Sequence, residues 1–283
     1  ANPFQLPAEN NRIYNFWRAI DFNPTYSFYD PVEGEPPNWS KGANHIYFVK
    51  DDRPYVKYAS NGRDTIHFAF TEAHPDRPIQ TSLYHAFYRN GILYTSRGVA
   101  VRELRKGPIR PSEATRVYDG VDTPTGEAWV WDIALDPQGR PVIAYTSHPA
   151  WDDVRYRYAR WNGTSWDDRQ IAFGGTRLYK TQEFYAGGIC LDPDDVNVVY
   201  LSSDVDIATG ALGKRGRYEI YKGITRDAGR SWKWEPITIL SSQDNLRPTV
   251  PAGHPGKTFV LWFRGNYTSY TEYDTEIVGL CRE

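Results

Sequence analysis

Two stretches of the chain align without a gap: "LDPQGRPVIAYTSH" (135–148) and "LDPDDVNVVYLSSD" (191–204). Each reads as the end of a strand, an Asp-Pro turn, and an apolar strand that closes in small polar residues. One structural unit is therefore used more than once. Repetition of such a unit is typical of propellers and other repeat architectures, so it restricts the fold before any motif is considered.

Three further segments follow the same plan of a turn and then an aromatic-rich strand of period two. They are "NNRIYNFWRAID" (10–21), "NGRDTIHFAFTEAHP" (61–75) and "GKTFVLWFRGNY" (256–267). A third strand follows in these units, as in "SLYHAFYRNG" (82–91), "VRYRYARWNG" (154–163) and "RYEIYKGITRDAG" (217–229). Most units also have a short fourth strand. We predict an all-β fold, a β-propeller of four-stranded antiparallel blades, with about five blades in one domain over residues 1–283.

The stretch "TRDAGRSW" (225–232) has the pattern of an Asp-box, which is best known from sialidases. Asp227 can bond the amides of its turn, Gly229 can supply a positive φ, and Trp232 can pack between blades. The stretch "RWNGTSW" (160–166) is a weaker version of the same motif. The Asp-box therefore indicates the fold and is silent on the reaction.

Composition narrows the possible functions. A net charge of −2 argues against a nucleic-acid partner, and no apolar run is long enough to span a membrane. The content of 10 Trp and 21 Tyr is high, and such rings suit surfaces that stack on sugars. Two cysteines, Cys190 and Cys281, are too few for a disulfide framework and leave their pairing open. No histidine pair has the spacing of a metal site, so we expect no metal and no cofactor.

Register nominates the site, because in a propeller the start of each first strand and the end of each second strand open on one face. The predicted ends of second strands carry Arg18, Glu72, His74, His148, Asp204 and Arg264. The predicted starts of first strands carry Arg53, Tyr55, Trp129, Trp131, Tyr185 and Arg247, and Asp132 is expected at or near the same rim. In "RGNYTSYTEYD" (264–274), Tyr267 and Tyr270 are expected in a loop on the same face, as an aromatic platform for sugar.

Several of these residues also fit a purely structural role. Arg18 and Arg264 each follow an aromatic pair on which they could stack. His74 and His148 each precede a proline and could be turn residues. Tyr185 is followed by "AGG", whose glycines would let a substrate approach the backbone.

Five segments together resemble the bacterial-neuraminidase-repeat propellers that include ulvan lyases and rhamnose–glucuronate lyases. They are "YNFWRAIDFNP", "RPYVKYASNG", "IHFAFTEAHP", "YAGGICLDPDD" and "RGNYTSYTEYDTEIV". The resemblance implies a seven-bladed propeller and a catalytic tyrosine at Tyr185, in a Tyr-x-Gly-Gly setting. The Asn-His-x-x-Pro histidine of those relatives is not found here. The position of their substrate-neutralising arginine looks like Ser203 or Asp204.

Three functions remain open. A polysaccharide lyase acting by β-elimination on a uronate needs a cation, a base and an acid, for which Arg18 or Arg264, His74 and Tyr185 are the candidates. A glycoside hydrolase needs two carboxylates, for which Glu72, Asp132 and Asp204 are available. A non-catalytic glycan-binding propeller needs only the aromatic rim. In each case we expect a polysaccharide or oligosaccharide partner and a secreted or periplasmic protein.

Overall fold

The computed structural model describes residues 1–283 except 20–21, 75–78, 180–183, 212–215, 255 and 283. The described chain is all-β apart from three short 3-10 turns at Pro7–Glu9, Leu104–Lys106 and Pro111–Glu113. Its helical segments are all too short to cross a membrane. The ends of two predicted repeat segments, residues 20–21 and Pro75, lie outside the described residues.

Five antiparallel sheets follow one another along the chain, as the repeat predicts. The first contains β1 (Asn2–Leu6), β2 (Arg12–Arg18), β3 (Pro24–Tyr29) and β4 (Ala43–Asn44). The second contains β5 (Val56–Ser60), β6 (Thr65–Phe70), β7 (Leu83–Arg89), β8 (Ile92–Thr95), β9 (Ala100–Glu103) and β10 (Thr115–Tyr118). The third contains β11 (Glu127–Leu135), β12 (Pro141–Ala150), β13 (Asp153–Trp161) and β14 (Trp166–Gly175). The fourth contains β15 (Ile189–Leu191), β16 (Val198–Ser203), β17 (Glu219–Ile224) and β18 (Lys233–Pro236), and the fifth β19 (Asp244–Thr249), β20 (Thr258–Ser269) and β21 (Glu272–Arg282).

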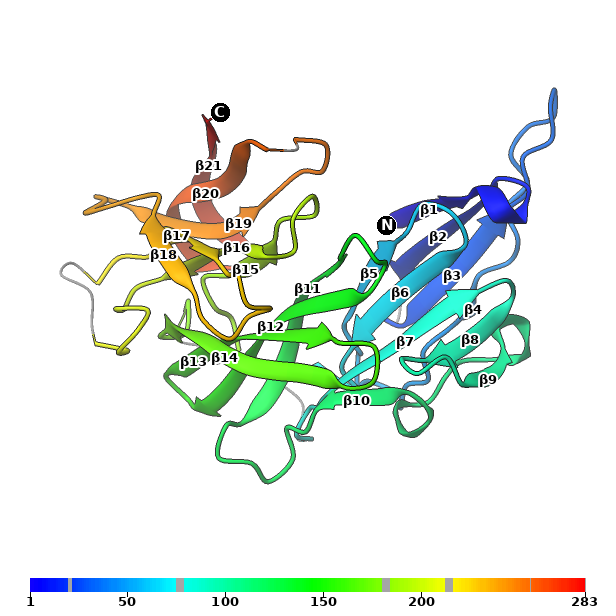
Figure 1. Ribbon diagram of the computed structural model, residues 1–283, viewed down its shortest axis with the longest axis horizontal. Coiled ribbons are helices and arrows are strands. Elements are labelled where there is room, and N and C mark those ends of the chain that lie inside the picture. Colours follow the sequence, from blue (N-terminus) through cyan, green and yellow to red (C-terminus); the bar gives the residue numbers. More distant parts are fainter. Residues whose placement is uncertain (20–21, 75–78, 180–183, 212–215, 255, 283) are drawn as a thin grey trace.

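The sheets are the blades of a propeller, arranged in an arc with the first and last sheets at its two ends (Figure 1). The first strands of neighbouring blades touch in series: β5 contacts β11, β11 contacts β15, and β15 contacts β19. Three blades have the predicted four strands, whereas the second has six and the fifth has three. The starts of these inner strands therefore gather on one face, where register had placed the candidate site.

The N-terminal segment is the inner strand of its own blade. β1 pairs antiparallel with β2, with Asn2 opposite Phe16, which settles its place in the first sheet.

Each junction between blades has its own hydrophobic core. Between the first two blades, the rings of Phe16 and Tyr58 stack with centroids 4.9 Å apart. Between the fourth and fifth, Ile220 packs with Val260 and Trp262. β6 and β16 are buried along their whole length because second strands are covered by blades on both sides. Stability thus comes from contacts between neighbours, as in other repeat proteins.

The Asp-box fastens the fourth blade, as predicted. The Asp227 carboxylate accepts hydrogen bonds from the amide (2.8 Å) and the hydroxyl (2.6 Å) of Ser231. Gly229 has φ +91°, and a Cβ there would lie 2.7 Å from the Tyr158 ring. The Trp232 ring meets Tyr158 of the third blade edge-on at 5.2 Å. The motif is thus structural and packs between blades.

The two cysteines are both free thiols. Cys190 is buried in the core and Cys281 is exposed on the last strand. The sequence left open whether the two cysteines pair, and the structure shows that they do not form a disulfide.

Candidate functional site

Ring side chains from four blades form a continuous group at the starts of the inner strands, which we call the aromatic cluster. Its members are Tyr55, His74, Trp129, Trp131, Tyr179, Tyr185, Tyr267 and Tyr270. Trp129, at the start of β11, lies at its centre and is 6% exposed. Its ring is 5.2 Å from Tyr55, 5.1 Å from His74 and 5.0 Å from Tyr185, centroid to centroid.

Tyr185 and His74 lie on the same face and close together. Their ring centroids are 6.5 Å apart, although they come from the fourth and second blades. His74 is buried, and its backbone amide donates to the carbonyl of Asp52 at 2.7 Å. Tyr185 stacks against Tyr270 at 6.4 Å with an interplanar angle of 16°. The two predicted catalytic residues could therefore touch one sugar unit.

The glycines after Tyr185 serve close packing of the protein against itself. A Cβ on Gly187 would lie 2.6 Å from the Ser202 hydroxyl oxygen, inside β16. Gly188 has φ +110°, and a Cβ there would lie 3.0 Å from the Trp131 ring. The expectation that these glycines admit a substrate is therefore replaced: they let the segment that carries Tyr185 pass between two blades.

Arg247 supplies a positive charge to the cluster. Its guanidinium carbon lies 5.2 Å from the ring centroid of Tyr267, 5.8 Å from Trp131 and 6.0 Å from Tyr185. Its backbone has φ +52°, and its amide donates to the Gly187 carbonyl at 2.6 Å. Among the described residues its buried Nε has no hydrogen-bond partner. A buried donor without a partner is costly, and a bound anion would satisfy it.

The surroundings of Tyr185 set its proton affinity. Burial raises the pKa of the Tyr185 phenol, and the nearby Tyr55 raises it further. A hydrogen bond with Tyr179 and the charge of Arg247 lower this pKa, but by less. Burial and the same hydrogen bond raise the pKa of Tyr179 as well. Because the pKa of Tyr185 is raised overall, its hydroxyl is protonated at neutral pH and can act as an acid.

Arg18 and Arg53 lie at the rim beside the cluster. The Arg18 guanidinium lies 4.4 Å from the Tyr55 ring centroid and 5.0 Å from that of Phe22. Arg53, with φ +54°, lies 5.9 Å from the same Phe22 ring. The rim therefore carries two cations next to aromatic surface. Arg18 also stacks on aromatic rings, which is the purely structural role that the sequence allowed for it.

Arg264 is paired with an acid within the last blade. The sequence predicted that this strand ends at Arg264. The strand, β20, instead continues to Ser269. Arg264 lies opposite Glu276 of β21, and its Nε donates to the Glu276 carboxylate at 2.8 Å. The supposed loop is thus a hairpin, in which Tyr267 faces Tyr273 across the strands with ring centroids 5.8 Å apart. The longer hairpin commits the Arg264 side chain to an exposed ion pair.

The three predicted carboxylates belong to three different places in the fold. Asp132 is half-buried and accepts the amides of Ile133 and Leu191, which joins the third blade to the fourth. Asp204 accepts the amide and hydroxyl of Thr176 at 3.0 and 2.7 Å. Burial raises the pKa of both carboxyls.

Glu72, the third, accepts the Ser82 amide at 2.8 Å and the Tyr84 hydroxyl at 3.0 Å within the second blade. His148 is also committed locally: its Nε2 bonds the Thr146 hydroxyl at 2.9 Å, and burial lowers its pKa to about 3. These residues support the blades next to the site.

Register missed Tyr179. Its ring lies 4.9 Å from that of Tyr185 and 6.0 Å from that of Tyr267, so it connects the fourth blade to the last hairpin. It precedes the first strand of its blade by ten residues, at a distance where strand periodicity carries no information. An aromatic residue upstream of "YAGG" was the only sequence signal available.

The fold and the shared face define an all-β propeller with an aromatic, cationic surface at the mouth of its inner strands. The profile of the BNR repeat-containing family matches residues 2–173, more than half of the chain, and the protein belongs to this family. No curated protein sequence gives a significant match.

Solved structures of similar fold include an ulvan lyase of polysaccharide lyase family PL25, bound to a GlcA(1-4)Rha3S oligosaccharide. It is 12% identical with a TM-score of 0.66 over 98% of this chain and 63% of that one. The polysaccharide lyase Uly1 is 12% identical with a TM-score of 0.53 over 99% of this chain and 57% of that one. The chain thus spans less than two thirds of the length of these lyases.

Proposed function

We propose that this protein is a polysaccharide lyase that cleaves a uronate-containing polysaccharide by β-elimination at the aromatic cluster. The observation that carries the proposal is the convergence of Tyr185, His74 and Arg247 on one face. These are an acid, a base and a cation, the three groups that such an elimination needs.

Each group has a defined part in the reaction. Arg247 binds the uronate carboxylate and stabilises the negative charge that develops when the neighbouring carbon loses its proton. His74 takes that proton, and the electron pair forms a carbon–carbon double bond as the glycosidic oxygen departs. Tyr185 donates its proton to the departing oxygen. The products are a new chain end and an unsaturated uronate.

Arg247 replaces Arg264 as the proposed cation. A partly desolvated guanidinium with an unpaired Nε–H interacts more strongly with a carboxylate than one already paired in water. Arg18, stacked on Tyr55 at the rim, is placed to hold a second acidic or sulfated sugar along the chain. The rings of Trp129, Tyr270 and their neighbours offer flat surfaces for sugar rings.

The likeness in fold to ulvan lyases supports this proposal without assigning the substrate. Glycoside hydrolysis is the weaker alternative, because it needs two carboxylates facing each other. The hydrogen bonds of Glu72, Asp132 and Asp204 direct these groups to three separate positions. A glycan-binding role would need only the aromatic cluster and remains the third reading.

A screen of uronate-rich polysaccharides separates the three functions. The protein is incubated with each polymer while ultraviolet absorbance and reducing ends are followed together. A lyase raises both signals, because elimination leaves a conjugated double bond. Reducing ends without absorbance would identify a hydrolase, and retention on the polymer without either signal would identify a binder.

A further inference from the structure

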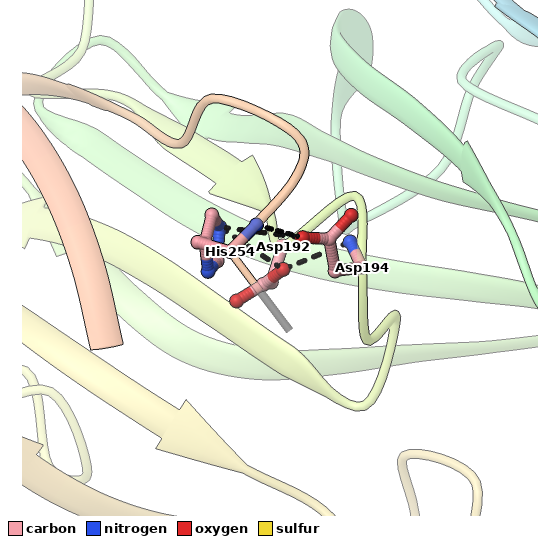
Figure 2. Close-up of side chains that lie close together, drawn as sticks. All are labelled: Asp192, Asp194 and His254. Atoms are coloured by element: carbon pink, nitrogen blue, oxygen red, sulfur yellow. Dashed lines mark hydrogen bonds and ion pairs between the residues drawn. The ribbon is translucent and has the colours of Figure 1, made fainter. Parts of the chain in front are cut away.

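Three side chains with metal-binding groups meet where the fourth and fifth blades adjoin, away from the aromatic cluster. Asp192 and Asp194 lie in the turn between β15 and β16, and His254 lies in the turn between β19 and β20 (Figure 2). One ligand atom from each lies within 4.8 Å of the other two. The aromatic cluster lies at the starts of the inner strands, whereas these turns follow their ends.

The imidazole of His254 presents a lone pair to the two carboxylates. Its Nδ1 lies 3.1 Å from the Lys257 carbonyl oxygen, which can only accept, so in the neutral ring Nδ1 carries the hydrogen. Its Nε2 then has no hydrogen. This atom is buried and without a hydrogen-bond partner among the described residues, and the side chain is 8% exposed.

Among the described residues, no hydrogen bond joins Nε2 of the His254 imidazole to either carboxylate. Nε2 lies 3.7 Å from an Asp192 oxygen and 4.0 Å from an Asp194 oxygen, beyond hydrogen-bond distance. The carboxylates are held in place by backbone amides: Asp192 accepts that of Asp194 at 2.9 Å, and Asp194 accepts that of His254 at 2.6 Å. Three electron-rich atoms are thus fixed around a common point.

The same position in the third blade shows what is missing here. Asp136 corresponds to Asp192 in the gapless repeat, and it is neutralised by Arg140 at 2.9 Å and Arg160 at 3.0 Å. In the fourth blade the repeat places Val196 where Arg140 stands, and strand register places Ile224 where Arg160 stands. The fourth blade has therefore kept the buried acid and lost both arginines.

We infer that Asp192, Asp194 and His254 bind a divalent metal ion of the zinc class, which takes the place of the two arginines and fastens the fourth blade to the fifth. One imidazole nitrogen with two carboxylates suits Zn²⁺, whereas Ca²⁺ and Mg²⁺ prefer all-oxygen sites. Water would complete the coordination. The search for histidine pairs in the sequence could not find this site, because its one histidine and two acids come from turns of different blades.

Zinc binding by the whole chain tests the inference. After dialysis against a chelator, Zn²⁺ is titrated into the protein by calorimetry, and thermal unfolding is followed with and without Zn²⁺. We expect one Zn²⁺ per chain and a higher Tm with the metal. Asp192→Asn and His254→Gln should each weaken binding by more than about a hundredfold and remove the Tm increase. Asp195→Asn, which removes a charge from the same turn, should bind like the wild type.

A second probe covers the case in which a variant fails to fold. Co²⁺ added to the wild-type chain should give visible absorption bands of a nitrogen-ligated site, and stoichiometric Zn²⁺ should abolish them. The inference is overturned if the folded wild-type chain binds neither ion stoichiometrically. It is also overturned if folded Asp192→Asn and His254→Gln bind Zn²⁺ as tightly as Asp195→Asn does. Neither result depends on lyase activity.

Discussion

The rings of His74 and Tyr185 lie 6.5 Å apart, centroid to centroid, and both contact the ring of Trp129, at 5.1 Å and 5.0 Å. His74 follows the second strand of the second blade, and Tyr185 precedes the first strand of the fourth. The site is therefore made by the packing of blades against one another. The proposed chemistry therefore depends on the cores at the blade junctions as much as on the reactive groups.

Replacing Tyr185 by Phe removes the proposed acid and keeps the ring packing. We expect the rate of elimination to fall by roughly a hundredfold or more, with Tm nearly unchanged. Because the pKa of Tyr185 is raised above 10, its hydroxyl stays protonated up to that pH. The wild-type rate should therefore not fall through loss of this proton below pH 10. Tyr94→Phe, which removes a hydroxyl from the outer part of the second blade, is the matched control. Equal rates for Tyr185→Phe and Tyr94→Phe would remove Tyr185 from the mechanism.

Arg247→Gln tests the proposed cation. The guanidinium acts on the uronate carboxylate both in the bound substrate and as charge develops, so KM should rise and kcat should fall together. Arg247→Lys should recover part of the loss, because the charge returns without the planar donor pair. Steady-state kinetics on a uronate polymer measures both constants, with Arg105→Gln, an exposed arginine paired to Glu103, as control. If KM and kcat are unchanged in Arg247→Gln, a residue other than Arg247 binds the uronate carboxylate.

Asp227→Asn should lower stability without changing the rate per folded molecule. Hydrogen bonds from Ser231 and Thr225 lower the pKa of this carboxyl to about 2, from 3.8. A lowered pKa means that the stabilisation is complete above 3.8 and is lost as the pH falls through 2. Thermal unfolding should therefore show a lower Tm for Asp227→Asn at neutral pH and a difference that closes near pH 2. A difference that does not depend on pH would show that the charge of Asp227 is irrelevant to the Asp-box.

Buried histidines should make the fold sensitive to mild acid. Burial lowers the pKa of His45 to about 3, from 6.5, and its Nε2 bonds the Tyr58 hydroxyl at 2.9 Å. Between pH 6.5 and pH 3 the unfolded chain binds a proton there that the folded chain does not, so stability falls as the pH falls. His45→Gln can keep a hydrogen bond to Tyr58 and should lose less Tm across this range. A parallel decline in both proteins would place the acid sensitivity elsewhere.

The repeat and its turns were sufficient to predict the blades and the face on which the starts of the inner strands gather. Period-two strands and Asp-Pro turns are local signals, and they fixed which residues end at the inner rim. The prediction was wrong where a strand continues beyond the residues that were expected to form a turn. β20 continues through Arg264 and Gly265 to Ser269, so the predicted sugar-binding loop is a hairpin.

Contacts that depend on the packing of distant blades were beyond the sequence. Tyr179 has no periodic pattern around it, and the role of Arg247 follows from its position above three rings of different blades. The glycines after Tyr185 illustrate the same limit. The sequence shows that the backbone is approached closely there, but only the structure shows that Ser202 and Trp131 make the approach.

The most direct test of the proposed reaction follows the ultraviolet absorbance of products from a uronate polysaccharide, with wild-type protein and Tyr185→Phe measured side by side. The proposal predicts absorbance that rises with the number of new reducing ends in the wild type, and loss of both signals in Tyr185→Phe. Reducing ends that appear without absorbance, or absorbance that persists undiminished in Tyr185→Phe, would contradict β-elimination at this site.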